Sequence, residues 1–368
     1  MRISNLKIAD FRKFGSLHLN FPRTISVILG PNACGKTTIL EAIFLLATGK
    51  SFRAEKDMEA IAFESELART SATMENATID KTNEQIELEV VLTRGEVMGI
   101  KTPMKRFLVN GVGKHTIDFV GRLRVVLFWP EDLELVTDSP SLRRRYLDFV
   151  LIQVDREYRR TLLSYERGLR QRNKLLEAIR DAGAHRHQLL FWDQLLIKSG
   201  EYITKKREEY ISYLNNAKTQ GLKDSKLDKY QLVYDNSIIS RPRLDQYSEE
   251  EVAAGATLVG PHRDDMKFKV KSQKLKVDEE EFRDLSHYGS RGEQRLGVLW
   301  LKLGELAYIE HVTEEKPVLL LDDILSELDH DHRKIIFGVI GQQQTIMTVT
   351  DVHLFEKKSG IEVEVIEL

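Results

Sequence analysis

The fold is decided by the stretch Gly30-Pro31-Asn32-Ala33-Cys34-Gly35-Lys36-Thr37, which matches the phosphate-binding pattern G-x-x-x-x-G-K-[ST]. A short, nearly all-apolar strand at residues 25–29 precedes it, and an apolar-rich helix at 39–46 follows it. Glycines let backbone N–H groups wrap phosphates. We therefore expect these eight residues and Thr38 to bind a nucleotide. In this site Lys36 would neutralise the β/γ oxygens, and the Thr37 hydroxyl would ligate Mg²⁺.

A second predicted strand supplies the acids that a phosphate-binding loop needs. Residues 317–321 form an apolar run typical of a buried parallel strand, and Asp322 and Asp323 follow it directly. Ligands bind at the carboxyl ends of strands in α/β sheets. We expect Asp322 to hold Mg²⁺ through water and Asp323 to polarise the attacking water as a catalytic residue, together with Lys36.

A third element is the sequence Ser290-Arg291-Gly292-Glu293-Gln294-Arg295, followed by leucines at helical spacing. A Ser and a Gly at a helix N-terminus make an anion site, although an ordinary N-cap explains these residues equally well on their own. The Ser290 element precedes the Asp322 strand by roughly 25 residues. The chain thus runs from phosphate loop to long insert, to Ser-x-Gly helix, to Asp-Asp strand.

Length and composition limit the classes that remain. The 368 residues suit two domains, or one domain with an insertion. The 55 Lys and Arg nearly cancel the 57 Asp and Glu, so a polyanion site must be a local patch. The single cysteine, Cys34, excludes a disulfide framework and a cysteine-based zinc site. The apolar runs are too short for a transmembrane helix, and no signal-peptide pattern precedes the first strand. We expect a soluble, cytoplasmic protein without a membrane partner.

The middle of the chain predicts a helical hairpin. Apolar or large residues recur at 4-3 spacing over 158–179 and again over 189–213, with a short turn between them. Two such helices would form an antiparallel arm of roughly 40 Å. The polar stretch 215–251 is typical of a loop with weak structure, and strand signals return at 257–259 and 268–270.

The segment 141–175 is locally basic. It holds ten Lys and Arg residues against four Asp and Glu residues, and Arg156, Arg159 and Arg160 are its candidate DNA-phosphate contacts. A solvated helix face explains the same pattern equally well, and residues 143–145 could instead serve a dimer interface. For His262-Arg263-Asp264-Asp265, a polar cluster is favoured over a metal site, because one His and adjacent acids on a strand rarely converge.

With these motifs in this order, the chain resembles ABC-type ATPase heads, and within them the SMC/Rad50 branch. The arm is too short for a full SMC or Rad50 protein, and the chain is most similar to the RecF family of bacterial recombination mediators. The blocks that carry this resemblance span most of the chain: Asp10-Phe11-Arg12-Lys13-Phe14, Leu40-Glu41-Ala42-Ile43, Gly49-Lys50-Ser51-Phe52-Arg53, Pro130-Glu131-Asp132-Leu133, Arg143-Arg144-Arg145-Tyr146-Leu147-Asp148, Val259-Gly260-Pro261-His262-Arg263-Asp264-Asp265, Ser290-Arg291-Gly292 and Leu321-Asp322-Asp323-Ile324-Leu325-Ser326-Glu327-Leu328-Asp329.

The resemblance implies an α/β fold, an ABC-type P-loop ATPase head of two lobes with a short helical-hairpin arm. Lobe I would combine 1–125 with 315–368, and lobe II would hold 126–314. Arg12 and Lys13 would reach the nucleotide phosphates, although a surface role is also open for both. Ser290 and Gly292 would contact the γ-phosphate held by a second copy.

The implied function is a nucleotide switch. Two chains would close head-to-tail around two ATP–Mg²⁺ and clamp duplex DNA at single-strand/double-strand junctions of gaps. Slow hydrolysis would reset the dimer, and the protein would help to load RecA with RecO and RecR. Three positions depart from the wider ABC pattern: Asp323 stands for the usual Glu, Glu293 for the usual signature Gln, and no switch His follows the strand at 345–349, since His353 comes later.

Two other classes remain open from the sequence. A transporter-type ABC ATPase would serve a membrane partner, but the hairpin insert argues against it. A P-loop phosphotransferase would use the same loop as a monomer and would need no Ser-Gly element.

Overall fold

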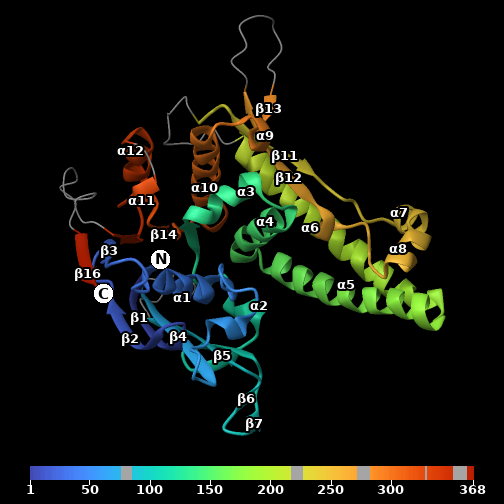
Figure 1. Ribbon diagram of the computed structural model, residues 1–368, viewed down its shortest axis with the longest axis horizontal. Coiled ribbons are helices and arrows are strands. Elements are labelled where there is room, and N and C mark those ends of the chain that lie inside the picture. The colour runs from blue at the N-terminus through green and yellow to red at the C-terminus, as the bar shows by residue number, and fades with distance from the viewer. Residues whose placement is uncertain (76–84, 217–226, 272–281, 328–329, 351–362) are drawn as a thin grey trace, which may run out of the picture. The chain divides into compact units, whose positions relative to one another are not determined.

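The computed structural model describes residues 1–75, 85–216, 227–271, 282–327, 330–350 and 363–368. The chain divides into two compact units (Figure 1). The first joins Met1–Asp132 with Glu305–Leu368, and the second is Leu133–Gly304. The lobe boundaries predicted from the sequence lie at 125/126 and 314/315, and the role of each lobe stays a prediction.

The first unit contains a five-stranded, all-parallel sheet in the order β10-β14-β15-β3-β16. Its strands are β3 (Ile25–Leu29), β10 (Val125–Phe128), β14 (Val318–Asp322), β15 (Thr345–Val349) and β16 (Val363–Glu367). Every residue of β10, β14 and β15 is buried, which is why these strands lack an alternating pattern in the sequence. The predicted strands at 25–29 and 317–321 are confirmed.

A six-stranded antiparallel sheet lies in the same unit, in the order β2-β1-β4-β5-β8-β9. Its strands are β1 (Arg2–Phe11), β2 (Phe14–Asn20), β4 (Leu67–Glu75), β5 (Ile86–Thr93), β8 (Lys105–Val109) and β9 (Val112–Lys114), and β6 (Glu96–Val97) pairs with β7 (Ile100–Lys101) beside them. Helix α1 (Lys36–Thr48) packs against strands of both sheets, and every one of its residues except Thr37 is buried. A nearly fully buried, apolar-rich helix therefore follows the phosphate loop.

The remaining elements of the first unit are short. They are η1 (Asp57–Ala60), α2 (Thr116–Phe119), α11 (Ile324–Glu327) and α12 (His330–Val339), with η2 (Pro130–Leu133) at the boundary between the units.

The second unit is built on the predicted helical hairpin. Helices α5 (Arg156–Ala182) and α6 (Leu189–Asn216) lie side by side, as Figure 1 shows. Asp155 caps α5 by accepting the Tyr158 N–H, and Gly183 ends it in the left-handed conformation with φ 64°. The two helices approach closely at Gly168, where an added Cβ would lie 2.6 Å from the Leu195 side chain.

Other elements of this unit surround the hairpin. They are α3 (Glu134–Thr137), α4 (Pro140–Val154), η3 (Arg186–Gln188), η4 (Pro261–Arg263), α9 (Leu285–Tyr288), the long α10 (Arg291–Thr313) that runs on past the unit boundary, and the antiparallel strands β11 (Tyr230–Asp235), β12 (Asp265–Lys271) and β13 (Phe282–Asp284). The strand signal at 268–270 is confirmed by β12.

Two expectations about this unit are wrong. The stretch 215–251 is predicted to be a loop with weak structure, but it contains the regular elements β11, α7 (Arg241–Gln246) and most of α8 (Ser248–Ala254); residues 217–226 lie outside the described residues. Residues 257–259 form no strand. Val259 is buried, and Thr257 donates hydrogen bonds to the Asn173 side chain rather than to a neighbouring strand. Among the described residues, no helix has both the length and the hydropathy to cross a membrane.

Candidate nucleotide-binding site

The phosphate-binding loop connects the C-terminal end of β3 to the first turn of α1. Two of its residues have positive φ, Ala33 at 63° and Gly35 at 106°. Gly35 is required for two reasons. Its backbone conformation is one that side chains disfavour, and an added Cβ would lie 2.5 Å from the Phe14 ring. The turn between β1 and β2 therefore packs directly on the loop.

Two ammonium groups lie at this loop. Lys36 is buried, and its Nζ donates to the carbonyl oxygens of Gly30 at 2.6 Å and Pro31 at 2.9 Å. Lys13 Nζ donates to the Ala33 carbonyl at 2.8 Å. Charge-assisted bonds to phosphate oxygens are stronger than bonds to neutral carbonyls. Both cations can thus exchange carbonyls for an incoming polyphosphate.

The acids lie beside the loop, because β14 and β3 belong to one sheet. Thr37 Oγ1 donates to Asp322 Oδ1 at 3.0 Å, and Thr348 Oγ1 donates to the same oxygen at 2.7 Å. The Asp323 N–H in turn donates to Thr348 Oγ1 at 2.9 Å, with Asp323 at φ 50°. The structure thus brings together Lys36, Thr37, Asp322 and Asp323. Thr348 of β15 belongs to this group but carries no motif in the sequence, so it was not predicted.

This donor set suits Mg²⁺ bound together with phosphates. A hydroxyl and a carboxylate oxygen are the hard ligands that Mg²⁺ prefers, and this ion usually keeps waters and takes its other ligands from the substrate. Across the part of the chain that the structure describes, no three His, Cys, Asp or Glu side chains form a group that could hold a metal by themselves. The fit is therefore to a nucleotide–metal complex rather than to a free structural ion.

Arg12 has a partner that the sequence did not reveal. Its Nη2 and Nε donate to the carboxylate of Glu41 at 2.6 and 3.1 Å, and its Nη1 donates to the Glu59 carbonyl at 2.9 Å. Glu41 is fully buried on α1 and also accepts a hydrogen bond from Ser51. Glu41 is the one acid in an apolar-rich helix, and this was the available signal for the cluster.

Ser290 and Gly292 belong to the second unit, at the exposed N-terminus of α10. Ser290 and Glu293 form a reciprocal capping box: the Glu293 carboxylate accepts the Ser290 N–H at 3.0 Å, and Ser290 Oγ accepts the Glu293 N–H at 3.2 Å. Arg283 donates to the other carboxylate oxygen at 2.5 Å. Burial would raise the pKa of Glu293, but the bonds from Ser290 and the Arg283 charge hold the pKa below its ordinary value.

The basic segment divides into buried and exposed residues. Arg143 and Arg172 are buried: Arg143 pairs with Asp265 at 2.6 Å, and Arg172 pairs with Asp193 and Glu251. These two guanidinium groups are therefore structural. Within this segment, the exposed cations of α5 recur at helical spacing, which places them along one side of the helix: Arg156, Arg160, Arg167, Arg170 and Lys174.

The three candidate DNA contacts differ from one another. Arg156 is exposed at the start of α5. Arg160 is also exposed and pairs with Glu157 at 2.6 Å, which raises its pKa. Arg159 is partly buried, and its guanidinium donates to the Ile152 carbonyl near the end of α4. Arg156 and Arg160 are thus the more accessible pair.

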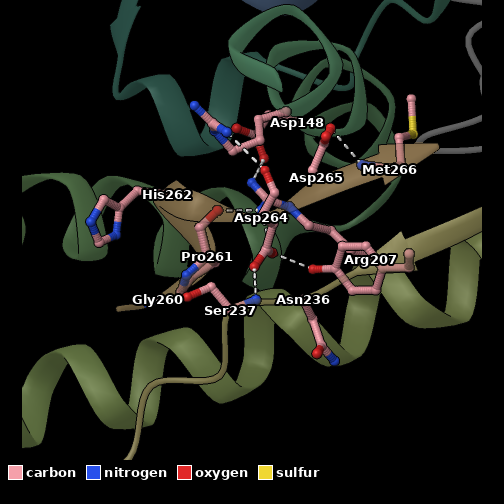
Figure 2. A network of polar contacts seen from close by, with 12 residues as sticks. Asp148, Arg207, Asn236, Ser237, Gly260, Pro261, His262, Asp264, Asp265 and Met266 are labelled. Carbon is pink, nitrogen blue, oxygen red and sulfur yellow. Dashed lines mark hydrogen bonds and ion pairs between the residues drawn. The ribbon is translucent and has the colours of Figure 1, made fainter. Parts of the chain in front are cut away.

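Residues 262–265 form a polar cluster around a buried ion pair (Figure 2). Arg207 Nη1 donates to Asp264 at 2.8 Å and to the Pro261 carbonyl at 2.7 Å, while its Nη2 donates to Asp148 at 2.9 Å. The Ser237 N–H and the Tyr234 hydroxyl also donate to Asp264. These contacts join α4, α6 and the strand pair β11–β12, and they occupy the acids that a metal would need.

Known proteins match this chain over nearly its whole length. The family described as "RecF/RecN/SMC N terminal domain" matches residues 2–362. A protein of Herpetosiphon aurantiacus named DNA replication and repair protein RecF is 38% identical, with 96% of this chain and 94% of that protein covered. A protein of the same name from Thermomicrobium roseum is 37% identical, with 97% of this chain and 95% of that protein covered.

Two solved structures give the same result. One is described as the recombination mediator protein RecF-ATP in the RecFOR pathway; it is 31% identical with a TM-score of 0.83, and 98% of this chain and 93% of that chain are covered. The other is described as RecF-ATPrS in the RecFOR pathway. It is 30% identical with a TM-score of 0.82, and 100% of this chain and 96% of that chain are covered. The expected α/β, ABC-type ATPase head with a helical-hairpin arm is thereby confirmed.

Proposed function

The chain belongs to the RecF family, within the wider group of RecF/RecN/SMC N-terminal domains, and on this premise we propose that it is an ATP-dependent DNA-binding protein of recombinational repair. The observation that carries the proposal is the arrangement of Lys36, Thr37 and Asp322 around one loop, in a chain similar to RecF proteins over nearly its whole length. ATP is the proposed nucleotide, because a solved relative is described as RecF-ATP.

In this proposal, the first unit binds ATP–Mg²⁺ through its own residues. The N–H groups of residues 30–38 surround the phosphates, Lys36 and Lys13 neutralise them, and Thr37 and Asp322 hold the metal. Asp323 orients the attacking water. Because Asp323 is one methylene shorter than the Glu usual in such ATPases, hydrolysis is proposed to be slow, as suits a switch. Phosphotransfer to a small substrate has no observation in its favour.

The second unit is proposed to complete the site of a second copy. Ser290 and Gly292 are exposed at the start of a long helix, where the N-terminal dipole favours an anion. Two chains would then close head-to-tail around two nucleotides, with the same surface used by both copies. The partner phosphate would replace the Glu293 carboxylate on the Ser290 N–H and hydroxyl.

Duplex DNA is the proposed ligand of the closed dimer. The exposed cations of α5 offer contacts that read phosphates without reading sequence. Action at single-strand/double-strand junctions, and cooperation with RecO and RecR in loading RecA, are proposed from family membership and from the RecFOR pathway in the descriptions of the solved relatives. A cytoplasmic location belongs to the same proposal.

The experiment is a mixing test of two variants. Ser290→Arg is expected to retain ATP binding as a monomer but to lose ATP-dependent dimerisation in sedimentation. Lys36→Ala is expected to bind ATP too weakly to fill its own site, with an affinity roughly 10- to 100-fold lower. Mixed together, the two form one intact composite site, with Lys36 from the first and Ser290 from the second. Partial recovery of DNA-stimulated ATPase supports the shared site. Full activity of Ser290→Arg alone, with no gain on mixing, would show that each chain completes its own site.

A further inference from the structure

The turn between β1 and β2 holds an energetically unfavourable conformation. Phe11 pairs with Phe14 across the strands, so the turn consists of Arg12 and Lys13 alone. Arg12 has φ 55°, a left-handed conformation that a residue with a long side chain seldom adopts. Such a conformation persists only where surrounding contacts enforce it. The structure must therefore contain the groups that hold Arg12 in place.

Those groups converge on Glu41. This carboxylate is fully buried on α1 and accepts two hydrogen bonds from the Arg12 guanidinium, at 2.6 and 3.1 Å. Ser51 donates to Glu41 at 2.5 Å, and Arg53 approaches it within 3.7 Å. A buried carboxylate with this many donors fixes their positions, because any donor that leaves exposes an unsatisfied charge.

The second residue of the turn is a cation at the phosphate loop. Lys13 directly follows Arg12, and its Nζ donates to the Ala33 carbonyl at 2.8 Å. Lys13 Cε lies 3.1 Å from the position that a Cβ on Gly35 would take, so the side chain lies against the loop. The backbone at Arg12 sets the direction in which the Lys13 side chain leaves the turn.

From this chain of contacts we infer that Glu41 is a positioning residue for nucleotide binding, which acts through Arg12 to hold Lys13 at the phosphate loop. This inference rests on the proposed ATP binding. It also reassigns Arg12, because a guanidinium satisfied by Glu41 and the Glu59 carbonyl serves as a tether, while Lys13 and Lys36 remain the two cations of the loop.

The test is a double-mutant cycle on ATP affinity, measured by calorimetry with Glu41→Gln and Lys13→Ala. Lys13→Ala is expected to weaken ATP binding about 10-fold, as for loss of one charge-assisted contact. Glu41→Gln is expected to weaken it by a similar factor, but by less than about 2-fold when Lys13 is already Ala. Glu59→Gln is the matched control with no expected change, because its own carboxylate does not contact Arg12.

The inference would be overturned if the loss of ATP affinity in the double variant equalled the product of the two single-variant losses. Glu41 would then act on the loop independently of Lys13. A general loss of stability does not produce the expected pattern, because it would weaken binding equally in both backgrounds. Where Glu41→Gln does not fold, Arg12→Gly removes the same tether and relieves the backbone strain, and the same non-additivity with Lys13→Ala is expected.

A second measurement does not depend on ATP. The nucleotide-free protein is treated with a small amine-reactive acetylating ester, and mass spectrometry follows the acetylation of Lys13 relative to that of Lys7. We expect Lys13 to be acetylated several-fold faster in Glu41→Gln than in the wild type. Equal rates would overturn the positioning role. If the wild type binds no ATP while the Lys13 rate still changes, the proposed function fails and the tether stands.

Discussion

His262 offers a test of the polar cluster through pH. Its Nε2 lies 3.0 Å from the Thr257 carbonyl, which can only accept, so Nε2 carries the proton and Nδ1 accepts from the Tyr165 hydroxyl at 2.8 Å. Burial lowers the pKa of His262 to about 4, and the nearby charges of Arg263, Arg144 and Arg172 act in the same direction. The folded protein therefore holds this imidazole neutral.

The direction of the pH effect follows from this pKa. The unfolded chain takes up the proton near the ordinary His pKa of 6.5, while the folded chain resists it until about 4. The stability that neutral His262 contributes is therefore complete above 6.5 and is lost as the pH falls from 6.5 to 4. A difference of about 2.5 pKa units at 1.36 kcal/mol each corresponds to about 3 kcal/mol.

The assay is urea unfolding at a series of pH values between about 7.5 and 4, for the wild type and for His262→Gln. The Gln amide can still donate to the Thr257 carbonyl but does not titrate. At each pH, the free energy of unfolding of His262→Gln is subtracted from that of the wild type, which cancels the contributions of the other titrating groups. This difference is expected to fall by about 3 kcal/mol as the pH is lowered. His187→Gln, at an exposed site outside the cluster, is the matched substitution control. A difference curve that is flat for His262→Gln would refute the reasoning.

Three further predictions concern the proposed switch. Lys36→Ala is expected to lower ATP affinity roughly 10- to 100-fold by calorimetry, because a charge-assisted contact contributes about 1.5–3 kcal/mol; unchanged affinity would contradict the loop assignment. Asp323→Asn is expected to bind ATP but to hydrolyse it more slowly, which lengthens the lifetime of the dimer in sedimentation; loss of metal-dependent binding would instead make it the metal ligand. Replacing Arg156 and Arg160 by Ser is expected to lower the slope of log K against log[salt] for duplex DNA by about 0.9 per lost contact, and an unchanged slope would assign both residues to the solvated helix face.

Much of the nucleotide site could be predicted from the sequence, because its determinants are local. The phosphate loop needs only glycines, a lysine and a hydroxyl in consecutive positions between a strand and a helix. The strand before Asp322 is buried on both faces, so it appears as an uninterrupted apolar run. The hairpin was equally visible, since the seam between α5 and α6 requires large residues at heptad spacing.

The stretch 215–251 could not be predicted in the same way, because its order comes from distant partners. Asn215 exchanges two hydrogen bonds with the backbone of Leu232 in β11. Glu251 is fully buried in α8, where the Arg172 guanidinium of α5 pairs with it at 2.7 Å. A polar sequence is typical of a loop only when its charges face water, and the sequence does not show which charges are paired inside the unit.

Arg172 and Arg12 show the same limit at sites of proposed function. Arg172 adds to the local positive charge of 141–175, but its compensating acids, Asp193 and Glu251, lie outside that segment, so counting charges within a window overstates the charge offered to DNA. Arg12 is predicted to contact phosphate, and in the structure its guanidinium pairs with the Glu41 carboxylate, which Arg53 also approaches at 3.7 Å. In both cases the arginine binds an anion as its residue type predicts, but that anion is a buried carboxylate of the same unit. A basic residue is therefore evidence for a phosphate site only after the acids of its whole unit have been paired, and at this loop that leaves Lys13 and Lys36.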